Sequence, residues 1–228
     1  MTVALRAGAP GFSFQSWRPG FYPAGARPAD FLALYAERLP TVEVNGSFYR
    51  LPAAKTLETW ARTVPDGFRF AFKVPRSISV FGRVDFVPDL CARVRALGDR
   101  LGPLLVRFAD GRARDDAFLA SLMDALDHDL EVALDFRDPS WDGVEPELER
   151  YGAVVRVNQL EADAAPFRYL RMREPPYDDA QLAETAATVE RLLGDGLDVY
   201  CYFRHEDEPT APAYAERLLA LAGRSASR

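Results

Sequence analysis

The chain has 228 residues, of which 48% are hydrophobic, enough for one domain with a substantial core. Its formal net charge of −6 argues against a general nucleic-acid coat, although it is compatible with a local basic site. No stretch approaches the roughly 20 apolar residues that span a bilayer, and the start lacks the pattern of a signal peptide. We therefore expect a cytoplasmic protein without membrane association, in which Cys91 and Cys201 are buried free thiols.

Strand-like segments alternate with helix-like segments along the chain. Eight strands are predicted, at residues 4–9, 41–45, 68–74, 103–108, 131–137, 153–158, 167–173 and 198–204. Helices are predicted at residues 29–39, 56–63, 87–97, 115–126, 145–151, 179–193 and 212–221. This alternation indicates a single-domain α/β fold, a TIM-type (β/α)8 barrel over residues 1–221, followed by a disordered tail at 222–228.

The connection between the sixth and seventh strands is too short for a helix. Only eight residues separate Asn158 from Phe167. An extended connector of this length can span a strand and allow a parallel return. We therefore expect the barrel to lack the helix between strands six and seven; a local hairpin is the alternative topology.

The segment 41–49, TVEVNGSFY, contains the first candidate site. Glu43 and Asn45 share one face of the predicted strand, and a carboxylate and an amide in an apolar strand are costly unless something uses them. Phe48 and Tyr49 follow directly and can form the wall of a pocket.

Polar residues also occur near the ends of other strands, where barrels of this type carry their chemistry. By strand parity they should face the interior together with Glu43, and they are Lys73, Arg107, Asp135, Arg137, Arg156, Asn158, Arg171, Arg173 and Arg204. Seven cations against the two carboxylates give this set a net charge of +5. Arginine-rich interiors suit phosphate or carboxylate ligands, and a salt-bridged plug without a ligand is the alternative.

Lys73 is one of only two lysines in the chain. A lysine buried among cations has a lowered pKa and can act as a base or nucleophile, whereas an ion pair with Glu43 is the alternative. Glu43 and Asp135 could also act as acid and base in glycoside cleavage. Two histidines and two unsuitably spaced cysteines provide no metal cluster, so we expect no metal and no cofactor.

Several loops that follow strands carry aromatic residues. Trp17, Phe21 and Tyr22 lie in a loop rich in proline and glycine, and Trp141 and Tyr177 follow strands five and seven. They can line a pocket and stack on a base or a sugar, or they can pack the loops together.

The order of these motifs resembles the DUF72 (YecE-like) family. The resemblance extends over nearly the whole chain through residues 8–17, 21–23, 41–45, 48–49, Pro52, Trp60, Pro65, 68–73, 135–137, Trp141 and 169–171. It implies a TIM barrel and no assigned function.

The chain departs from the family pattern at five places. Where family members usually have Thr-His, this chain has Ser79-Val80, and where they have Arg-Leu-His-Gly, it has RMRE at residues 171–174. The family's Gln-Leu-Pro-Pro is replaced by RFAD at residues 107–110. Asp135 replaces a glutamate of the family pattern, and Arg204-His205 replaces two asparagines. Both motif histidines are absent, so a family reaction that needs them would be lost.

We expect a hydrolase-type enzyme for a phosphorylated or otherwise anionic substrate at the barrel mouth. Glu43, Lys73 and Asp135 are the predicted catalytic residues. The predicted substrate-binding residues are Asn45, Tyr49, Arg107, Arg137, Trp141, Asn158, Arg171, Arg173 and Arg204. The alternatives are a non-catalytic protein that binds nucleic acid or an anionic ligand, and a structural partner protein with a self-neutralised interior.

Overall fold

The computed structural model describes residues 3–161, 165–205 and 208–225. Its strands are β1 (Leu5–Ala9), β2 (Thr41–Val44), β3 (Arg69–Lys73), β4 (Leu101–Arg107), β5 (Val132–Asp135), β6 (Val154–Arg156), β7 (Phe167–Met172) and β8 (Asp198–Phe203). Its α-helices are α1 (Phe31–Ala36), α2 (Ala54–Thr63), α3 (Arg76–Ser79), α4 (Val87–Val94), α5 (Asp116–Ala125), α6 (Glu145–Leu148), α7 (Asp179–Gly194) and α8 (Thr210–Ser225). Short 3-10 helices are η1 (Gln15–Trp17), η2 (Pro28–Asp30), η3 (Asn45–Phe48), η4 (Val84–Phe86), η5 (Arg95–Arg100), η6 (Pro139–Trp141) and η7 (Glu149–Tyr151).

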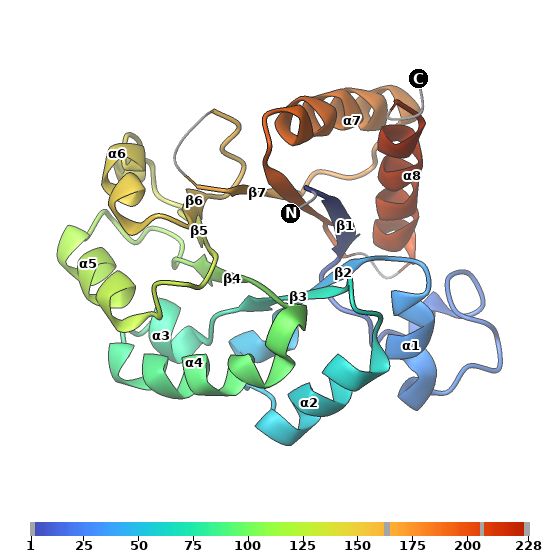
Figure 1. Ribbon diagram of the computed structural model, residues 1–228, viewed down its shortest axis with the longest axis horizontal. Helices are drawn as coiled ribbons and strands as arrows, with labels where there is room; N and C mark the ends of the chain where they lie inside the picture. Colours follow the sequence, from blue (N-terminus) through green and yellow to red (C-terminus); the bar gives the residue numbers. More distant parts are fainter. Residues whose placement is uncertain (1–2, 162–164, 206–207, 226–228) are drawn as a thin grey trace.

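The strands form a nearly closed parallel barrel inside a ring of helices (Figure 1). The sheet order is β6-β5-β4-β3-β2-β1-β8-β7, and every paired neighbour is parallel. Beyond the end of β6, the main-chain N–H of Asn158 donates to the carbonyl of Tyr169 in β7 at 2.9 Å, which links the two outermost strands. The predicted TIM-type barrel is therefore confirmed.

Arg168 covers the side of the barrel where a helix is missing. Within the described chain no helix lies between β6 and β7, as the short connection predicted. Arg168 is fully buried and donates hydrogen bonds to the carbonyls of Glu161, Ala165 and Phe167, at 2.8, 3.3 and 2.7 Å. A buried guanidinium with several acceptors thus fixes parts of the connector against β7.

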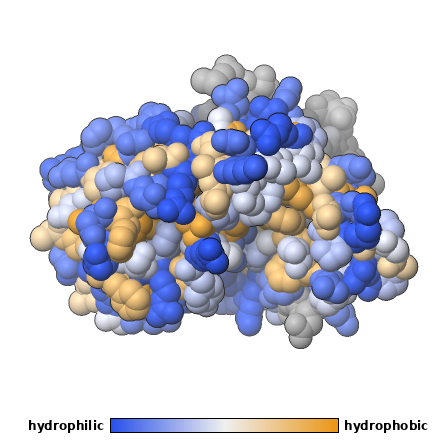
Figure 2. Space-filling model, turned by 90° about the horizontal axis from the view of Figure 1, so that it is seen from below, coloured by the Kyte–Doolittle hydropathy of each residue, from blue (hydrophilic) through white to orange (hydrophobic). Residues whose placement is uncertain are grey.

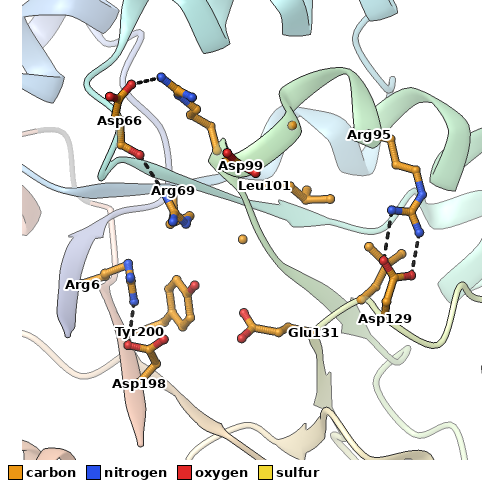
Figure 3. Close-up of a pocket in the computed structure, with 14 residues that line it drawn as sticks. Arg6, Asp66, Arg69, Arg95, Asp99, Leu101, Asp129, Glu131, Asp198 and Tyr200 are labelled. Carbon is orange, nitrogen blue, oxygen red and sulfur yellow. Dashed lines mark hydrogen bonds and ion pairs between the residues drawn. The ribbon is translucent and has the colours of Figure 1, made fainter. Parts of the chain in front are cut away.

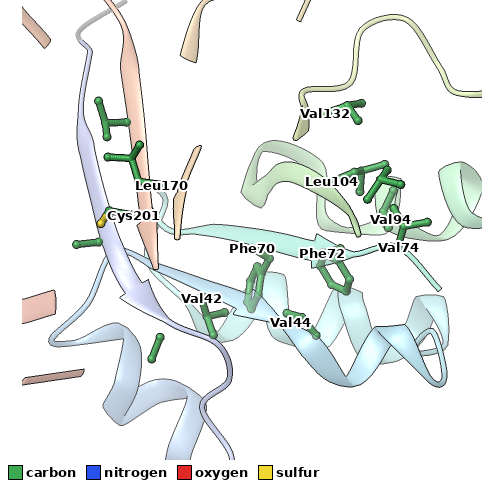
Figure 4. Packing of buried hydrophobic residues seen from close by; sticks show 14 of the residues in the cluster. Val42, Val44, Phe70, Phe72, Val74, Val94, Leu104, Val132, Leu170 and Cys201 are labelled. Carbon is green, nitrogen blue, oxygen red and sulfur yellow. The ribbon is translucent and has the colours of Figure 1, made fainter. Parts of the chain in front are cut away.

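Apolar side chains pack on both faces of the barrel, as expected for a parallel sheet covered by helices. Outside, residues such as Val42, Phe70 and Leu104 belong to a large cluster between strands and helices (Figure 4). Inside, a second cluster includes Ala71, Leu105, Ala133, Val155, Phe167, Tyr169 and Tyr200. The interior therefore has an apolar middle layer with polar residues towards both ends.

Several boundaries differ from the prediction. The helix predicted at 29–39 is η2 followed by the short α1, and α3 was not predicted. The helix predicted to end at 221 continues to Ser225, with Ala222 buried in the core, so the tail prediction is wrong for 222–225. Residues 226–228 lie outside the described residues.

Cys91 and Cys201 are buried free thiols, as predicted. Burial raises the pKa of Cys201 to about 12.

Among the described residues, no helix combines the length and apolar character needed to cross a bilayer. The face seen in Figure 2 is largely hydrophilic, with separate small hydrophobic areas.

Candidate functional site

A largely buried arginine, Arg171, links two carboxylates at the carboxyl-terminal mouth of the barrel. Glu43, on β2, is fully buried and accepts hydrogen bonds from the Tyr169 hydroxyl at 2.7 Å and from Arg171 Nη2 at 2.9 Å. Asp135, on β5, accepts from Arg171 Nη1 at 3.2 Å and from Arg173 Nη2 at 2.6 Å. Arg171 on β7 therefore holds both predicted catalytic carboxylates in place.

The protonation of this network follows from burial and charge. Burial raises the pKa of Tyr169 well above its usual value, and the neighbouring Glu43 charge adds to this effect, so the hydroxyl remains a donor. Burial alone would lower the pKa of Arg171, but the negative charges of Glu43 and Asp135 raise it overall. The arginine is thus a permanent cation at the centre of the site.

Lys73 lies in the same cluster of charged residues but forms no ion pair with a described carboxylate. Within the described part of the chain, no carboxylate lies within 4.0 Å of its ammonium group, so the alternative ion pair with Glu43 does not form. Its Nζ lies 4.1 Å from the centroid of the Phe48 ring. Burial lowers the pKa of Lys73, and the charge of Arg171 lowers it further, against the opposing effect of Glu43.

The loop carboxylate Asp110 pairs with two arginines at the rim of the mouth. Asp110 accepts two hydrogen bonds from Arg107 Nη2, at 2.8 and 2.9 Å, and one from Arg137 Nε at 3.4 Å. Arg137 Nη1 also lies 3.8 Å from Asp135 Oδ1. The hydrogen bond and charge of Arg107 lower the pKa of Asp110. This residue follows β4 on a loop and was not included in the predicted interior set.

Arg156 is the one cation of the predicted set that lies outside the barrel. Val155 faces the interior cluster, so the neighbouring Arg156 points outward, where it pairs with Asp142 and Glu145 at 2.8 Å each. Its predicted interior position is wrong, because the parity of the short β6 was misassigned by one residue. With Arg156 removed and Asp110 added, six cations face three carboxylates, a net charge of +3 instead of +5.

A cavity of about 360 Å³ opens beside this network. Its polar lining residues include Glu43, Asn45, Arg171, Arg173, Arg204 and His205. Arg204 is exposed and makes no ion pair with the described residues. The His205 ring stacks on Phe14 with the centroids 3.9 Å apart. The carboxylates are thus paired as in the self-neutralised alternative, but the site also contains the open space that this alternative lacks.

Asn45 presents an unused acceptor at this cavity. Its Nδ2 donates a long hydrogen bond, 3.5 Å, to the Pro10 carbonyl. Its Oδ1 is buried and has no hydrogen-bond partner among the described residues. Because a buried acceptor without a partner is unfavourable, the amide is well suited to a donor on a bound molecule.

Five predicted binding residues do not line the cavity: Arg107 and Arg137, which pair with Asp110, and Tyr49, Trp141 and Asn158. Trp141 is fully buried, stacks on Phe136 at 4.3 Å and donates to the Arg112 carbonyl, so it packs the loops that follow β4 and β5. Tyr49 is 76% exposed and projects into solvent. Asn158 has a φ of 64°, and its amide bonds the main-chain N–H and C=O of Arg171 at 2.7 and 3.3 Å. Its amide therefore joins β7 to the end of β6, which removes it from our proposed site.

The first loop forms no aromatic lid. Trp17, Phe21 and Tyr22 are all buried and pack against one another, which supports the loop-packing alternative. Tyr169 was not among the predicted site residues, although it lies two residues before Arg171 and parity places both on one face. In the described ranges, no group of three or more histidine, cysteine, aspartate or glutamate side chains could hold a metal ion.

Comparisons with known proteins agree on the family and the fold. The profile of the family described as "Protein of unknown function DUF72" matches residues 6–228. The UPF0759 protein YecE of Escherichia coli O157:H7 is 28% identical over 167 residues, and that of strain K12 is 27% identical. These alignments cover 70% of this chain but only 61% of each relative.

Two solved structures have the same fold. A DUF72 family protein from Thermotoga maritima MSB8 superposes with a TM-score of 0.79 at 20% identity, over 98% of this chain and 99% of the other. A DUF72 family protein from Enterococcus faecalis V583 gives a TM-score of 0.78 at 18% identity, over 96% of each chain.

Proposed function

Because the chain belongs to the DUF72 family, whose description names no function, we propose an activity from the mouth geometry: an enzyme that binds a small phosphorylated or otherwise anionic molecule and hydrolyses it. The observation that carries this proposal is the excess of cations in the lining of a cavity of about 360 Å³, where Arg171, Arg173 and Arg204 face one carboxylate, Glu43. An anion in this cavity would compensate the charge that the protein leaves uncompensated.

The lining residues have separate roles in this proposal. Arg204 and Arg173 bind the anion, and Asn45 Oδ1 accepts a hydrogen bond from a substrate hydroxyl or from the attacking water. Glu43 and Asp135 position Arg171, because each is already hydrogen-bonded to it; we therefore do not assign them as the acid and base of glycoside cleavage.

Two groups near the mouth are suited to proton transfer. His205 lines the cavity and is of the residue type that titrates near neutral pH. Lys73 has a lowered pKa because of its burial, so part of its amine is available as a base at lower pH than usual. In the family pattern two asparagines occupy positions 204 and 205, so this chain has a cation and a titratable group where that pattern has amides.

Thermal denaturation with inorganic phosphate and hydrolysis of p-nitrophenyl phosphate test the proposal. We expect phosphate to raise the melting temperature of the wild type, and Arg204→Gln to abolish this rise and the hydrolysis. Arg156→Gln is the matched control, since it removes one cation from the outer face. Equal responses of both variants, or no response of the wild type to phosphate, would contradict the proposed site. Binding without hydrolysis would support the non-catalytic alternative.

A second candidate function is the binding of single-stranded nucleic acid. It is favoured by Tyr49 and Phe81, which are 76% and 61% exposed and follow β2 and β3. The Arg76 guanidinium lies 4.9 Å from the Phe81 ring centroid. Exposed aromatics beside arginines suit base stacking. Fluorescence anisotropy of a labelled oligonucleotide should then show binding that falls steeply with salt and weakens in Tyr49→Ser; no binding at low salt rejects this candidate.

A further inference from the structure

A second and larger cavity, of about 890 Å³, lies at the amino-terminal end of the barrel (Figure 3). Its lining includes Arg6 on β1, Arg69 on β3 and Tyr200 on β8. It shares no described lining residue with the mouth cavity, and the apolar interior cluster of Ala71 and its neighbours lies between the two ends. Its volume is in the range of pockets that bind small molecules.

Most charged groups of this cavity are paired with one another. Arg95 donates to Asp129 and to the nearby Asp127, and Arg100 pairs with Asp66. Arg6 Nη1 lies 3.0 Å from Asp198 Oδ1, although this contact does not satisfy hydrogen-bond geometry. These pairs account for most of the charge near the rim.

Three charged lining groups have no ion-pair partner among the described residues: the solvent-exposed Asp99, and two less exposed groups of opposite charge, Arg69 and Glu131. Arg69 Nη1 donates to the main-chain carbonyls of Asp66 and Phe68, and no carboxylate lies within 4.0 Å of its guanidinium in the described structure. Likewise, no described cation lies within 4.0 Å of the Glu131 carboxylate. Both side chains extend into the cavity in Figure 3. Arg69 and Glu131 are therefore neighbours in one space without being partners.

The surroundings of these two groups define two separate subsites. Tyr200 lines the cavity together with Glu131, and Asp198 adds a second negative charge near this carboxylate. Burial raises the pKa of Glu131, and Asp198 raises it further, so a cation beside Glu131 would relieve both effects. Near Asp66, the Arg100 Nε is buried without a hydrogen-bond partner among the described residues, which leaves a second donor on the side of Arg69.

We propose that this amino-terminal cavity is a binding site for a small zwitterion with one ammonium group and one carboxylate, the class to which free amino acids belong. The ammonium group lies against Glu131, Tyr200 and Asp198. The carboxylate lies against the guanidinium of Arg69, with Arg100 Nε as a further donor. The proposal does not depend on the function proposed for the mouth.

Thermal denaturation of the full chain with matched probes tests this site. The zwitterions are L-norvaline, L-serine and L-phenylalanine. The probes without a carboxylate are butylamine, ethanolamine and phenethylamine, and those without an amine are pentanoate, 3-hydroxypropanoate and 3-phenylpropanoate. At about one hundred times its dissociation constant, a bound zwitterion should raise the melting temperature by about 5–10 °C. Each single-charge analogue should give a smaller rise at the same concentration.

Variants at both subsites separate binding from a structural role. Glu131→Gln and Arg69→Lys should lose the rise caused by the amino acid. Glu131→Gln removes a half-buried carboxyl that has no ion-pair partner among the described residues, so we expect this variant to fold. Arg204→Gln, at the other end of the barrel, should keep the response to the amino acid. The proposal is overturned if none of the three amino acids raises the wild-type melting temperature, or if the rise persists in Glu131→Gln.

Discussion

Replacing Arg171 by methionine tests whether the buried network at the mouth stabilises the barrel. The substitution removes the guanidinium that bonds both Glu43 and Asp135 and leaves a side chain of similar length. Asp135 keeps its 2.6 Å hydrogen bond from Arg173. Among the described residues, Glu43, which is fully buried, keeps only the hydrogen bond from the Tyr169 hydroxyl. The cost should therefore come mainly from the unpaired charge of Glu43.

Removing one partner of a buried ion pair costs about 3–5 kcal/mol. Because the Arg171 side chain is 16% exposed, water can partly solvate the charges that remain, and we expect a loss near 3 kcal/mol. For a chain of this length, each kcal/mol lowers the melting temperature by about 2–4 °C, so Arg171→Met should melt roughly 6–12 °C below the wild type. Calorimetry or circular dichroism measures this difference.

A second substitution identifies the charge that is responsible. Adding Glu43→Gln to Arg171→Met should restore part of the stability at pH 8. Arg156→Met, which breaks ion pairs on the outer face, should cost less than about 1 kcal/mol. A deficit below about 2 °C at pH 8 in Arg171→Met would refute the reasoning.

Three further predictions concern single residues. Lys73 should be acylated by acetic anhydride at lower pH than the exposed Lys55, because burial lowers the pKa of Lys73. Peptide mass spectrometry measures the acylation of both lysines, and the same dependence on pH at both would contradict the lowered pKa. Glu131→Gln should gain stability over the wild type as pH rises from about 4 to 8, because the raised pKa of Glu131 costs the folded state stability above the unfolded value. Thermal denaturation at several pH values shows this, and a constant difference would rule it out. Asn158→Ala should lose about 1–3 kcal/mol in urea denaturation, and Asn158→Gly less, because glycine keeps the positive φ but not the amide bonds to Arg171.

The barrel could be predicted because its determinants are local. Each strand is a short run of apolar and β-branched residues between helical segments, and this alternation is visible without tertiary information. The missing helix followed from a distance argument, since eight residues cannot form a helical crossover. What compensates for it was not visible: Arg168 in β7 has no sequence signal for burial, and its acceptors are main-chain carbonyls of the connector.

The site was predicted in part because strand parity reports direction but not partners. Glu43, Lys73, Asp135, Arg171 and Arg173 do converge at the mouth. Parity also placed Arg156 inside, since a shift of one residue reverses the face of a short strand. Trp141 and Tyr49 follow strands as pocket residues do, but a loop path decides whether such an aromatic faces the core or the solvent.

The charges left without partners, and not the total charge, decide which ligands the two ends of the barrel suit. At the mouth, Glu43 and Asp135 are engaged by arginines, and the loop residue Asp110 engages others, so the uncompensated groups are cations. At the opposite end, Arg69 and Glu131 remain without an ion-pair partner among the described residues, besides the solvent-exposed Asp99. The apolar middle layer separates the two sets of charged residues, so the charges at one end cannot neutralise those at the other. An anion compensates the first and a zwitterion the second, although the same interior face of the same strands builds both.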